Sequence, residues 1–372
     1  MTYQREFDRR LEIAVVGVGG HCYRNLLPAM TYLPVRIRAM CDLDARRLAT
    51  TADQYGVPGR YADTAEMYRA EADQLDAVFL AVGSKQHPPL TAEALDAGLP
   101  VWMEKPPAMR ASQIEELIAR RSTASSRSNG GELPVVVGFK KAFMPATDKA
   151  LEVFGEGHHV LRSLFAQYPM DLPEDGPAVL ESGEMCAMLA NGCHPLSMMI
   201  AVGGPVAAVR AIRAPRGGGV CLLEFAGGAL GNFHLAAGMH GPCERYSFFG
   251  EGVQLDVENA WTVTLHRGTP GRYGRTVSYC PPGDGHGSVV WQPQNYLSTL
   301  ENMAWFTQGV YAEMMYFCRC VLDGRPARRG SLEFALEVMR VYEAALVSEG
   351  ERVELAPADG DWLTRDAPDD QP

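Results

Sequence analysis

The segment from residue 77 to residue 106 constrains the fold of this chain more than any other stretch. Its sequence, AVFLAVGSKQHPPLTAEALDAGLPVWMEKP, predicts a buried strand, a loop that holds His87, a helix, and a second short strand. That second strand leads into Glu104, Lys105 and Pro106. Open α/β sheets bind their ligands at the carboxyl ends of their strands. Lys105 is therefore a candidate acid, base or anchor for a ligand, and Glu104 is a candidate partner for a lysine or for a cofactor amide.

A glycine-rich turn comes earlier in the chain. Residues 11–16 form a short apolar run typical of a parallel strand, and residues 23–30 can continue as a helix. Between them, glycines allow a tight bend and the close approach of a ligand, and the helix N-terminus favours a pyrophosphate. Cys22 stands where the usual fingerprint has its third glycine, and it is small enough for packing between helix and strand. The turn predicted to bind a dinucleotide consists of Gly17, Val18, Gly19, Gly20, His21 and Cys22.

An acidic residue supports the dinucleotide site. Residues 35–40 form a second strand candidate, and Asp42 follows it about 20 residues after the glycines, as a ribose-binding carboxylate requires. The carboxylate can accept hydrogen bonds from both ribose hydroxyls and repels a 2'-phosphate, so we expect NAD to be preferred over NADP. Arg46 and Arg47 follow, and we interpret them as exposed charges on a helix. A preference for NADP would point to one of these arginines.

With these motifs in order, the chain resembles the Gfo/Idh/MocA oxidoreductases, typified by glucose-fructose oxidoreductase and inositol dehydrogenase, over nearly its whole length. Residues 135–143 read VVVGFKKAF, similar to the family's strand followed by a basic pair and an aromatic residue. Residues 189–199 read LANGCHPLSMM, similar to the family's helix with a catalytic histidine, here His194. Ala190 occupies the position at which the family usually has an aspartate.

Hydride transfer at a carbinol carbon needs a group that moves the hydroxyl proton. The resemblance implies that His194 is this acid/base and that Lys105 is hydrogen-bonded to the reacting oxygen. Histidine titrates near neutral pH, whereas lysine does so only when burial or a nearby positive charge lowers its pKa. Without the aspartate, Lys105 is the alternative carrier of the proton. Lys141 matches a basic position of the family's substrate cleft, and Asn191 is a candidate to orient the ring of His194.

The resemblance also implies how the cofactor is held. His87 is expected to shape the nicotinamide pocket rather than to perform chemistry. Beyond the glycine turn, the expected cofactor contacts are Asp42, Ala81, Val82, Gly83, His87, Glu104 and Lys105.

Length and patterning predict two domains. At about 150 residues per domain, a chain of 372 residues should hold two, and the pattern changes near residue 142. Residues 1–142 alternate strand and helix patterns and predict a doubly wound parallel sheet of the Rossmann type. Residues 143–372 predict an α+β domain with a large, open, mostly antiparallel sheet. The resemblance implies that this sheet carries the substrate on one face and the subunit contacts of a homodimer or homotetramer on the other. Its strand candidates are 220–225, 228–236, 246–249, 254–257 and 261–265.

Apolar residues at helical spacing over 303–321 and 332–346 predict two final helices, the second with Ser331 as its N-cap and Gly350 as its stop. The segments 169–184 and 268–294 are too long for ordinary connections, which makes them candidate lids or interface loops. Trp291, in the second of them, could stack on a sugar ring or fill a subunit contact.

Composition excludes several classes of partner. A net charge of −11 argues against nucleic acid. The N-terminus lacks an apolar signal core, and no apolar run approaches the roughly 18 residues that span a bilayer, so we expect a cytoplasmic protein without membrane contact. Nine cysteines without a secreted pattern are expected to be core residues, and no spacing predicts a metal site. The nucleophile elbow, the P-loop and the H-E-x-x-H motif are absent from the sequence.

These features predict an NAD-dependent dehydrogenase that oxidises a secondary hydroxyl, or reduces the matching ketone, of a small-molecule sugar, cyclitol or sugar derivative. Two alternatives stay open within the resemblance. One is an NAD-using glycosidase that oxidises a carbon transiently to allow elimination. The other is a sensor that binds the dinucleotide without turnover, which the alanine at position 190 favours.

Overall fold

The computed structural model describes residues 6–125, 131–155, 159–239, 243–268, 286–293 and 302–356. They form two compact units, each with its own sheet. The first unit takes its described residues from Met1–Lys140 and Gly309–Leu336, and the second takes them from Lys141–Gln308 and Glu337–Ala358. The sequence expectation assigned 143–372 to the second domain as one continuous range, whereas the segment Gly309–Leu336 groups here with the first unit.

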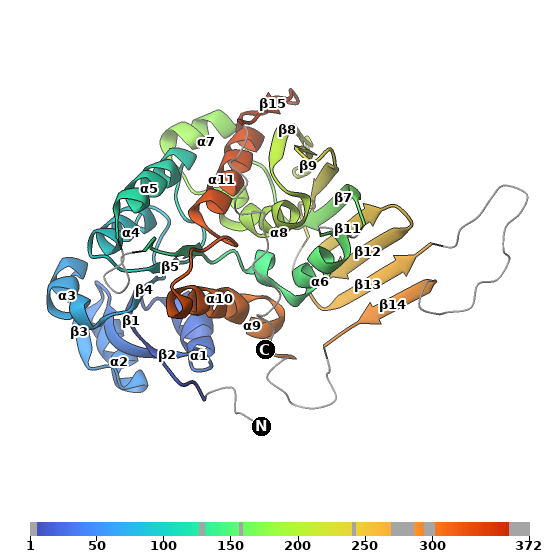
Figure 1. The fold of residues 1–372 in the computed structure, drawn as a ribbon. Coiled ribbons are helices and arrows are strands. Elements are labelled where there is room, and N and C mark those ends of the chain that lie inside the picture. Colours follow the sequence, from blue (N-terminus) through green and yellow to red (C-terminus); the bar gives the residue numbers. More distant parts are fainter. Residues whose placement is uncertain are drawn as a thin grey trace, which may run out of the picture. The chain divides into compact units, whose positions relative to one another are not determined.

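The first unit contains a six-stranded parallel sheet in the order β3-β2-β1-β4-β5-β6 (Figure 1). The strand order reverses at β1, which has β2 on one side and β4 on the other. This confirms the doubly wound parallel sheet. Strands β1 and β4 are almost entirely buried, which explains their continuous apolar sequences. The strands are β1 Leu11–Val16, β2 Val35–Cys41, β3 Gly59–Tyr61, β4 Ala77–Leu80, β5 Val101–Met103 and β6 Val135–Val137.

Helices connect these strands. Among the helices of this unit, α3 contacts α4, α4 contacts α5, and α1 contacts α10. Helix α10 also contacts β6, which explains why its segment groups with this unit. The helical segments are a π-helical turn at Cys22–Leu26, α1 Leu27–Met30, α2 Ala45–Tyr55, α3 Thr64–Glu71, α4 His87–Asp96, α5 Ala111–Thr123 and α10 Val310–Asp323. His87 was expected in a loop, but it is the first residue of α4, because prolines directly after it are well tolerated in a first helical turn.

The second unit contains a nine-stranded sheet in the order β14-β13-β12-β11-β7-β10-β9-β8-β15 (Figure 1). Its pairs are antiparallel except for β7 with β10, which confirms the mostly antiparallel open sheet. All five strand candidates are confirmed, as β9 to β13. The strands are β7 Leu161–Tyr168, β8 Val206–Arg213, β9 Gly219–Phe225, β10 Leu230–Leu235, β11 Arg245–Gly250, β12 Val253–Glu258, β13 Thr262–Arg267, β14 Gly287–Trp291 and β15 Val353–Glu354.

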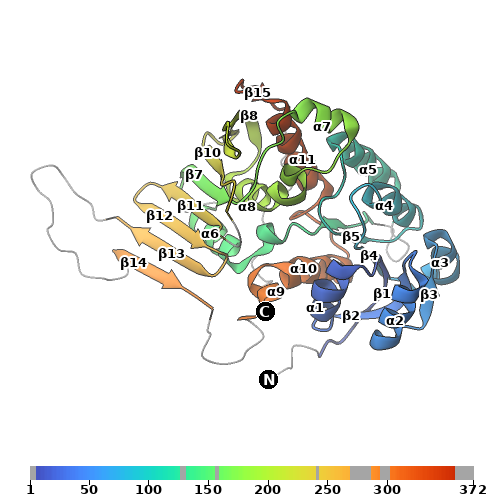
Figure 2. The ribbon, with the colours of Figure 1, turned by 180° about the vertical axis from the view of Figure 1, so that it is seen from behind.

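Helices α6 (Pro145–Phe154) and α8 (Cys193–Gly203) contact each other, and they pack on β13 and β7 respectively (Figure 2). Helix α11 (Leu332–Val347) confirms the last predicted helix, and Ser331 caps it by accepting a hydrogen bond at Oγ from Phe334 N. The division between the units falls inside α11.

Three expectations need correction. The single helix over 303–321 is two, α9 (Ala304–Thr307) and α10, because Gly309 takes φ +87° between them. The segment 169–184 holds α7 (Gly176–Ser182), whose Asp175 carboxylate caps the helix. Within 268–294, residues 269–285 and 294 lie outside the described residues, and Trp291 is not in a loop but in β14, where the Lys149 ammonium lies 4.9 Å from its ring centroid.

Candidate functional site

The glycine turn follows β1 and has the geometry that the sequence predicts. Gly17 takes φ +85°, and a Cβ on it would lie 2.5 Å from the carbonyl oxygen of Ala81 and 2.8 Å from Val82 Cγ1. Only glycine fits there, because the obstructing oxygen belongs to the backbone. Around Gly20, by contrast, no atom lies within 4 Å of where a Cβ would stand. The turn therefore packs tightly against the end of β4 at Gly17 and leaves open space above Gly20.

Asp42 is anchored beside this turn. Its Oδ2 accepts a hydrogen bond from Val18 N at 2.8 Å, and its Oδ1 accepts one from Asp44 N at 2.8 Å. Arg47 is exposed on α2, as expected, and its Nη1 lies 3.6 Å from the same Oδ2. Each carboxylate oxygen keeps a second lone pair for another donor. The next residue, Leu43, is 93% exposed, and the sequence pattern did not single it out.

Glu104 and Lys105 follow β5. The side chain of Glu104 contacts the glycine turn and the backbone: its Oε1 lies 2.8 Å from His21 Nε2, and its Oε2 accepts from the backbone N–H of Lys105 at 2.9 Å. The next carbonyl, that of Pro106, accepts a hydrogen bond from His87 Nδ1 at 2.8 Å. His87 is fully buried, and this burial lowers its pKa, which keeps the ring neutral. His87 therefore holds the backbone in place directly after Lys105.

A buried carboxyl from α10 completes this edge. Glu313 is 1% exposed, and its Oε1 lies 3.3 Å from where a Cβ on Gly138 would stand. Among the described residues its Oε2 has no hydrogen-bond partner. Burial raises the pKa of Glu313 well above its ordinary value, the charge of Glu104 raises it further, and Lys140 and Lys105 lower it in part. Glu313 is thus held neutral. The buried carboxyl of Glu313 could not be predicted from the sequence, because the residues at helical spacing around it are apolar.

Together these residues fit a dinucleotide. The glycine turn, Asp42, residues 81–83 and Lys105 follow the carboxyl ends of β1, β2, β4 and β5, which lie side by side in one sheet. The open space at Gly20 would let a pyrophosphate approach the backbone, and the Asp42 carboxylate would accept hydrogen bonds from ribose hydroxyls. These strand ends flank the strand-order reversal at β1, where such sheets usually bind ligands.

In the second unit, His194 is the second residue of α8 and is 6% exposed. The ring of Tyr168, the last residue of β7, lies beside it at a centroid distance of 6.4 Å. Burial raises the pKa of Tyr168, and the charge of Glu244 and the Cys193 thiol raise it further, so the phenol keeps its proton. Sequence reasoning missed Tyr168, because nothing in its spacing links it to the α8 histidine.

Ala190 and Asn191 lie in a π-helical turn, Met188–Gly192, directly before α8. Such a turn carries i→i+5 hydrogen bonds in place of the i→i+4 bonds of an α-helix. Asn191, expected as a substrate contact and a candidate to orient the histidine, is exposed to solvent.

Lys141 is not a surface cation. Its ammonium forms a buried ion pair with Glu244 and donates to Gln308 Oε1 at 2.8 Å. The second oxygen of Glu244 accepts from Tyr246 Oη at 3.0 Å. Lys141 and Glu244 are 2% and 6% exposed, respectively, so the expected substrate-cleft lysine is an internal support of the second unit. Because Glu244 is more than 100 residues from Lys141 in sequence, no local motif predicts this ion pair.

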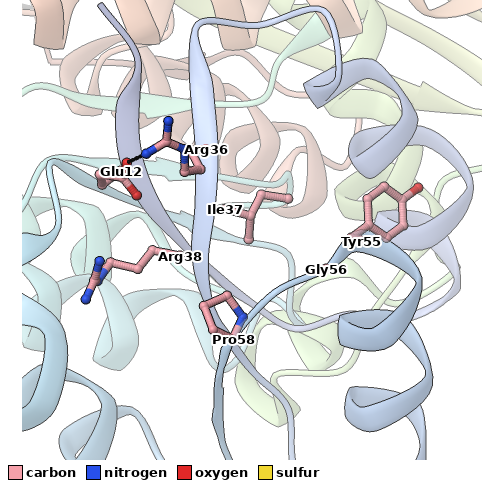
Figure 3. Close-up of a pocket in the computed structure, with 7 residues that line it drawn as sticks. All are labelled: Glu12, Arg36, Ile37, Arg38, Tyr55, Gly56 and Pro58. Carbon is pink, nitrogen blue, oxygen red and sulfur yellow. Dashed lines mark hydrogen bonds and ion pairs between the residues drawn. The ribbon is translucent and has the colours of Figure 1, made fainter.

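A cavity of about 270 Å³ lies elsewhere, at the opposite ends of β1 and β2 (Figure 3). Its charged lining is already paired: Arg36 donates to Glu12 at 2.7 Å and Arg38 donates to Glu71 at 2.6 Å. We assign this cavity no role in the chemistry, because none of the predicted site residues lines it. Its lining residues are Glu12, Arg36, Ile37, Arg38, Tyr55, Gly56 and Pro58.

Other features of the described residues carry no catalytic group. No cluster of three or more His, Cys, Asp or Glu side chains that could hold a metal ion occurs within them. Burial raises the thiol pKa of Cys22 and Cys221 to about 12, so these buried cysteines are unreactive thiols. Within the same part of the chain, no helix has the length and apolar character needed to cross a membrane.

Comparisons with known proteins agree with this geometry. The Gfo/Idh/MocA sequence model, described as an oxidoreductase family with an NAD-binding Rossmann fold, matches residues 11–128. Trans-1,2-dihydrobenzene-1,2-diol dehydrogenase of Mus musculus is 24% identical over 272 residues, 68% of this chain and 76% of that relative. Inositol 2-dehydrogenase of Corynebacterium glutamicum is 41% identical over 101 residues, only 27% of this chain and 29% of that relative. An oxidoreductase of Agrobacterium radiobacter, solved with NAD+, L-tartaric acid and magnesium, has the same fold, with a TM-score of 0.73 at 18% identity over 93% of this chain and 98% of the other.

Proposed function

We propose that this chain, a Gfo/Idh/MocA oxidoreductase whose residues 11–128 form the NAD-binding Rossmann domain, transfers hydride between NAD and a secondary hydroxyl or ketone of a sugar, cyclitol or related polyol. One observation carries the proposal. A single edge of the parallel sheet presents an open glycine turn, an anchored ribose-binding carboxylate and an ionisable lysine. These are the parts needed to seat a dinucleotide and to handle an oxygen at its reactive end.

The residues of the turn bind and orient the cofactor. Backbone N–H groups near Gly20 would hold the pyrophosphate, and the remaining lone pairs of Asp42 would accept hydrogen bonds from the ribose hydroxyls. The charge of Asp42 repels a 2'-phosphate, which supports a preference for NAD, and Arg47 at 3.6 Å weakens that repulsion. Asp42→Ser should therefore reduce the discrimination against NADP, measured as the ratio of the two dissociation constants. Tighter binding of NADP than of NAD by the unchanged protein would show that Arg47, not Asp42, decides the preference.

When bound, NAD would supply the hydride acceptor, and the chain's own residues must move the hydroxyl proton. We assign Lys105 to hold the reacting oxygen by a hydrogen bond and His194 to exchange the proton as acid and base. Because position 190 supplies no carboxylate to His194, Lys105 is the other carrier of the proton. Lys105→Ala should abolish turnover while NADH still binds, and His194→Ala should lower the rate by about 10²-fold or more.

A purified-protein screen of sugars and cyclitols with NAD and with NADP tests the function, with the absorbance of the reduced cofactor as the readout. Net NADH release with a polyol supports the dehydrogenase. Release of an aglycone without net NADH would instead identify a glycosidase, and binding without turnover would identify a sensor. Wild-type turnover in both alanine variants would refute the assigned residues. Loss of turnover in Lys105→Ala alone would assign the proton to the lysine.

The open face of the nine-stranded sheet is the proposed contact with a second copy of the chain. On this face, Leu222 of β9 stands beside Arg210 of β8 and Asn232 of β10, and Ile212 and Leu230 are more than half exposed nearby. Exposed apolar side chains on an open sheet face are typical of an oligomer interface. Light scattering should find a homodimer or homotetramer, and Leu222→Glu should shift it toward the monomer. A monomeric wild type would exclude the contact.

A further inference from the structure

Glu104 lies at the centre of a set of contacts that the dehydrogenase chemistry does not by itself require. Its side chain is 11% exposed, and both of its oxygens are engaged. One oxygen meets the ring of His21, which belongs to the glycine turn, and the other accepts the backbone N–H of Lys105. The carboxylate thus bridges two segments that are more than 80 residues apart in sequence.

The hydrogen bonds of His21 define its tautomer. A carboxylate only accepts, so His21 Nε2 carries the proton and donates to Glu104 Oε1 at 2.8 Å. The other ring nitrogen, Nδ1, then accepts from the side-chain amide of Asn25 at 3.0 Å. Asn25 lies one helical turn further along, so the ring is held from two sides. Both ring nitrogens are thus engaged.

Removal of the His21 ring would leave the Glu104 carboxylate poorly solvated. Its carboxylate is nearly buried, and a buried acceptor that loses its donor bears the full cost of its desolvation. The backbone N–H of Lys105 donates to Oε2 of this same carboxylate, so a shift of Glu104 would shift the lysine backbone with it. The position of the lysine therefore depends on a histidine of the cofactor-binding turn.

We propose that His21 is a positioning residue that couples the glycine turn to Glu104, so that the turn which seats the dinucleotide also fixes the backbone of Lys105. The proposal rests on the function assigned to Lys105 above, but the contact itself is between described side chains of one compact unit. His21 acts through Glu104 and needs no contact with the substrate.

A double-mutant cycle between His21 and Glu104 tests the coupling, with two readouts. The first is the dissociation constant of NADH, measured by fluorescence titration, which needs no substrate. The second is kcat with a polyol from the screen. We expect His21→Ala to raise the dissociation constant about fivefold and to lower kcat about tenfold, but to change each less than twofold when Glu104 is already Gln.

Two further variants separate positioning from general damage. His21→Gln keeps an N–H donor toward Glu104 and an acceptor toward Asn25, so it should restore kcat to within about threefold of the wild type. Tyr23→Phe removes a 2.8 Å hydrogen bond to Gln54 from the π-helical turn that directly follows His21, and it should change neither readout. If His21→Ala fails to fold, His21→Leu, which also removes the donor to Glu104, takes its place in both Glu104 backgrounds.

Additive effects of the His21 and Glu104 substitutions on both readouts overturn the proposal, as does an equal loss in Tyr23→Phe. Failure of the proposed function is a separate result: Lys105→Ala would keep its turnover. In that case the cycle on NADH binding still decides whether His21 and Glu104 are coupled.

Discussion

Alanine substitutions at Gly17 and Gly20 should separate folding from cofactor binding within one short turn. At Gly17, a methyl group would meet a backbone oxygen at 2.5 Å, and the residue would have to keep φ +85°. At Gly20, the backbone is helical and the space for a methyl group is open. The first substitution therefore strains the protein, whereas the second only fills space that we assign to the pyrophosphate.

The cost at Gly17 follows from two contributions. A non-glycine residue in a sparsely populated positive-φ region costs about 1–3 kcal/mol. Overpacking against atoms that cannot move aside costs about 1–3 kcal/mol more. We expect Gly17→Ala to lower the free energy of unfolding by about 4 kcal/mol, a large share of the roughly 5–15 kcal/mol that stabilises a typical protein. Gly20→Ala should change it by less than about 1 kcal/mol, because alanine is favoured over glycine in a helix.

Urea unfolding followed by circular dichroism measures the first effect, and NADH fluorescence titration measures the second. Gly20→Ala should raise the dissociation constant of NADH about tenfold or more, because the methyl group keeps the pyrophosphate from the backbone N–H groups. Unchanged stability in Gly17→Ala would refute the steric argument. Wild-type NADH affinity in Gly20→Ala would show that the open space is not where the pyrophosphate binds.

Three further outcomes follow from the contacts. Because burial depresses the pKa of His87 below 6.5, the unfolded chain binds its proton more readily, so stability should fall as the pH drops below about 6.5. His87→Asn should flatten that dependence in unfolding experiments between pH 7 and pH 5. Lys141→Met should cost about 3–5 kcal/mol of unfolding free energy by leaving the Glu244 charge buried, and adding Glu244→Gln should recover part of the loss, whereas additive losses would contradict a buried pair. Ala190→Asp should shift the pH profile of turnover, because a carboxylate four residues before His194 can meet its ring across one helical turn, and an unchanged profile would show that the two side chains do not meet.

The parallel sheet and its ligand edge could be predicted from local sequence. Strands buried on both faces are short apolar runs, and residues that directly follow such runs share one edge of the sheet. For this reason Gly17, Asp42 and Lys105 could be placed together from their positions alone, and the sheet order bears this out. The antiparallel strands at β9 to β13 were predicted for the same reason, since alternation and a Gly-Gly turn are local signals.

Helix boundaries were less secure, because they depend on single backbone angles and on packing. A continuous apolar stripe over 303–321 predicted one helix, yet the positive φ of Gly309 ends one helix and begins another. The same segment then contributes α10 to the first unit, where the buried carboxyl of Glu313 has a raised pKa. Periodicity reports which side of a helix is apolar, but it does not report which sheet that side meets.

The sequence by itself therefore determined the Rossmann sheet, the glycine turn and the residues at the carboxyl ends of its strands, since each is encoded within a few consecutive residues. Only the tertiary structure decided which side chains support them. The bonds of Glu104 to His21 and of Lys141 to Glu244 join residues 83 and 103 positions apart. Such contacts arise when distant segments pack together, and spacing along the chain carries no signal for them.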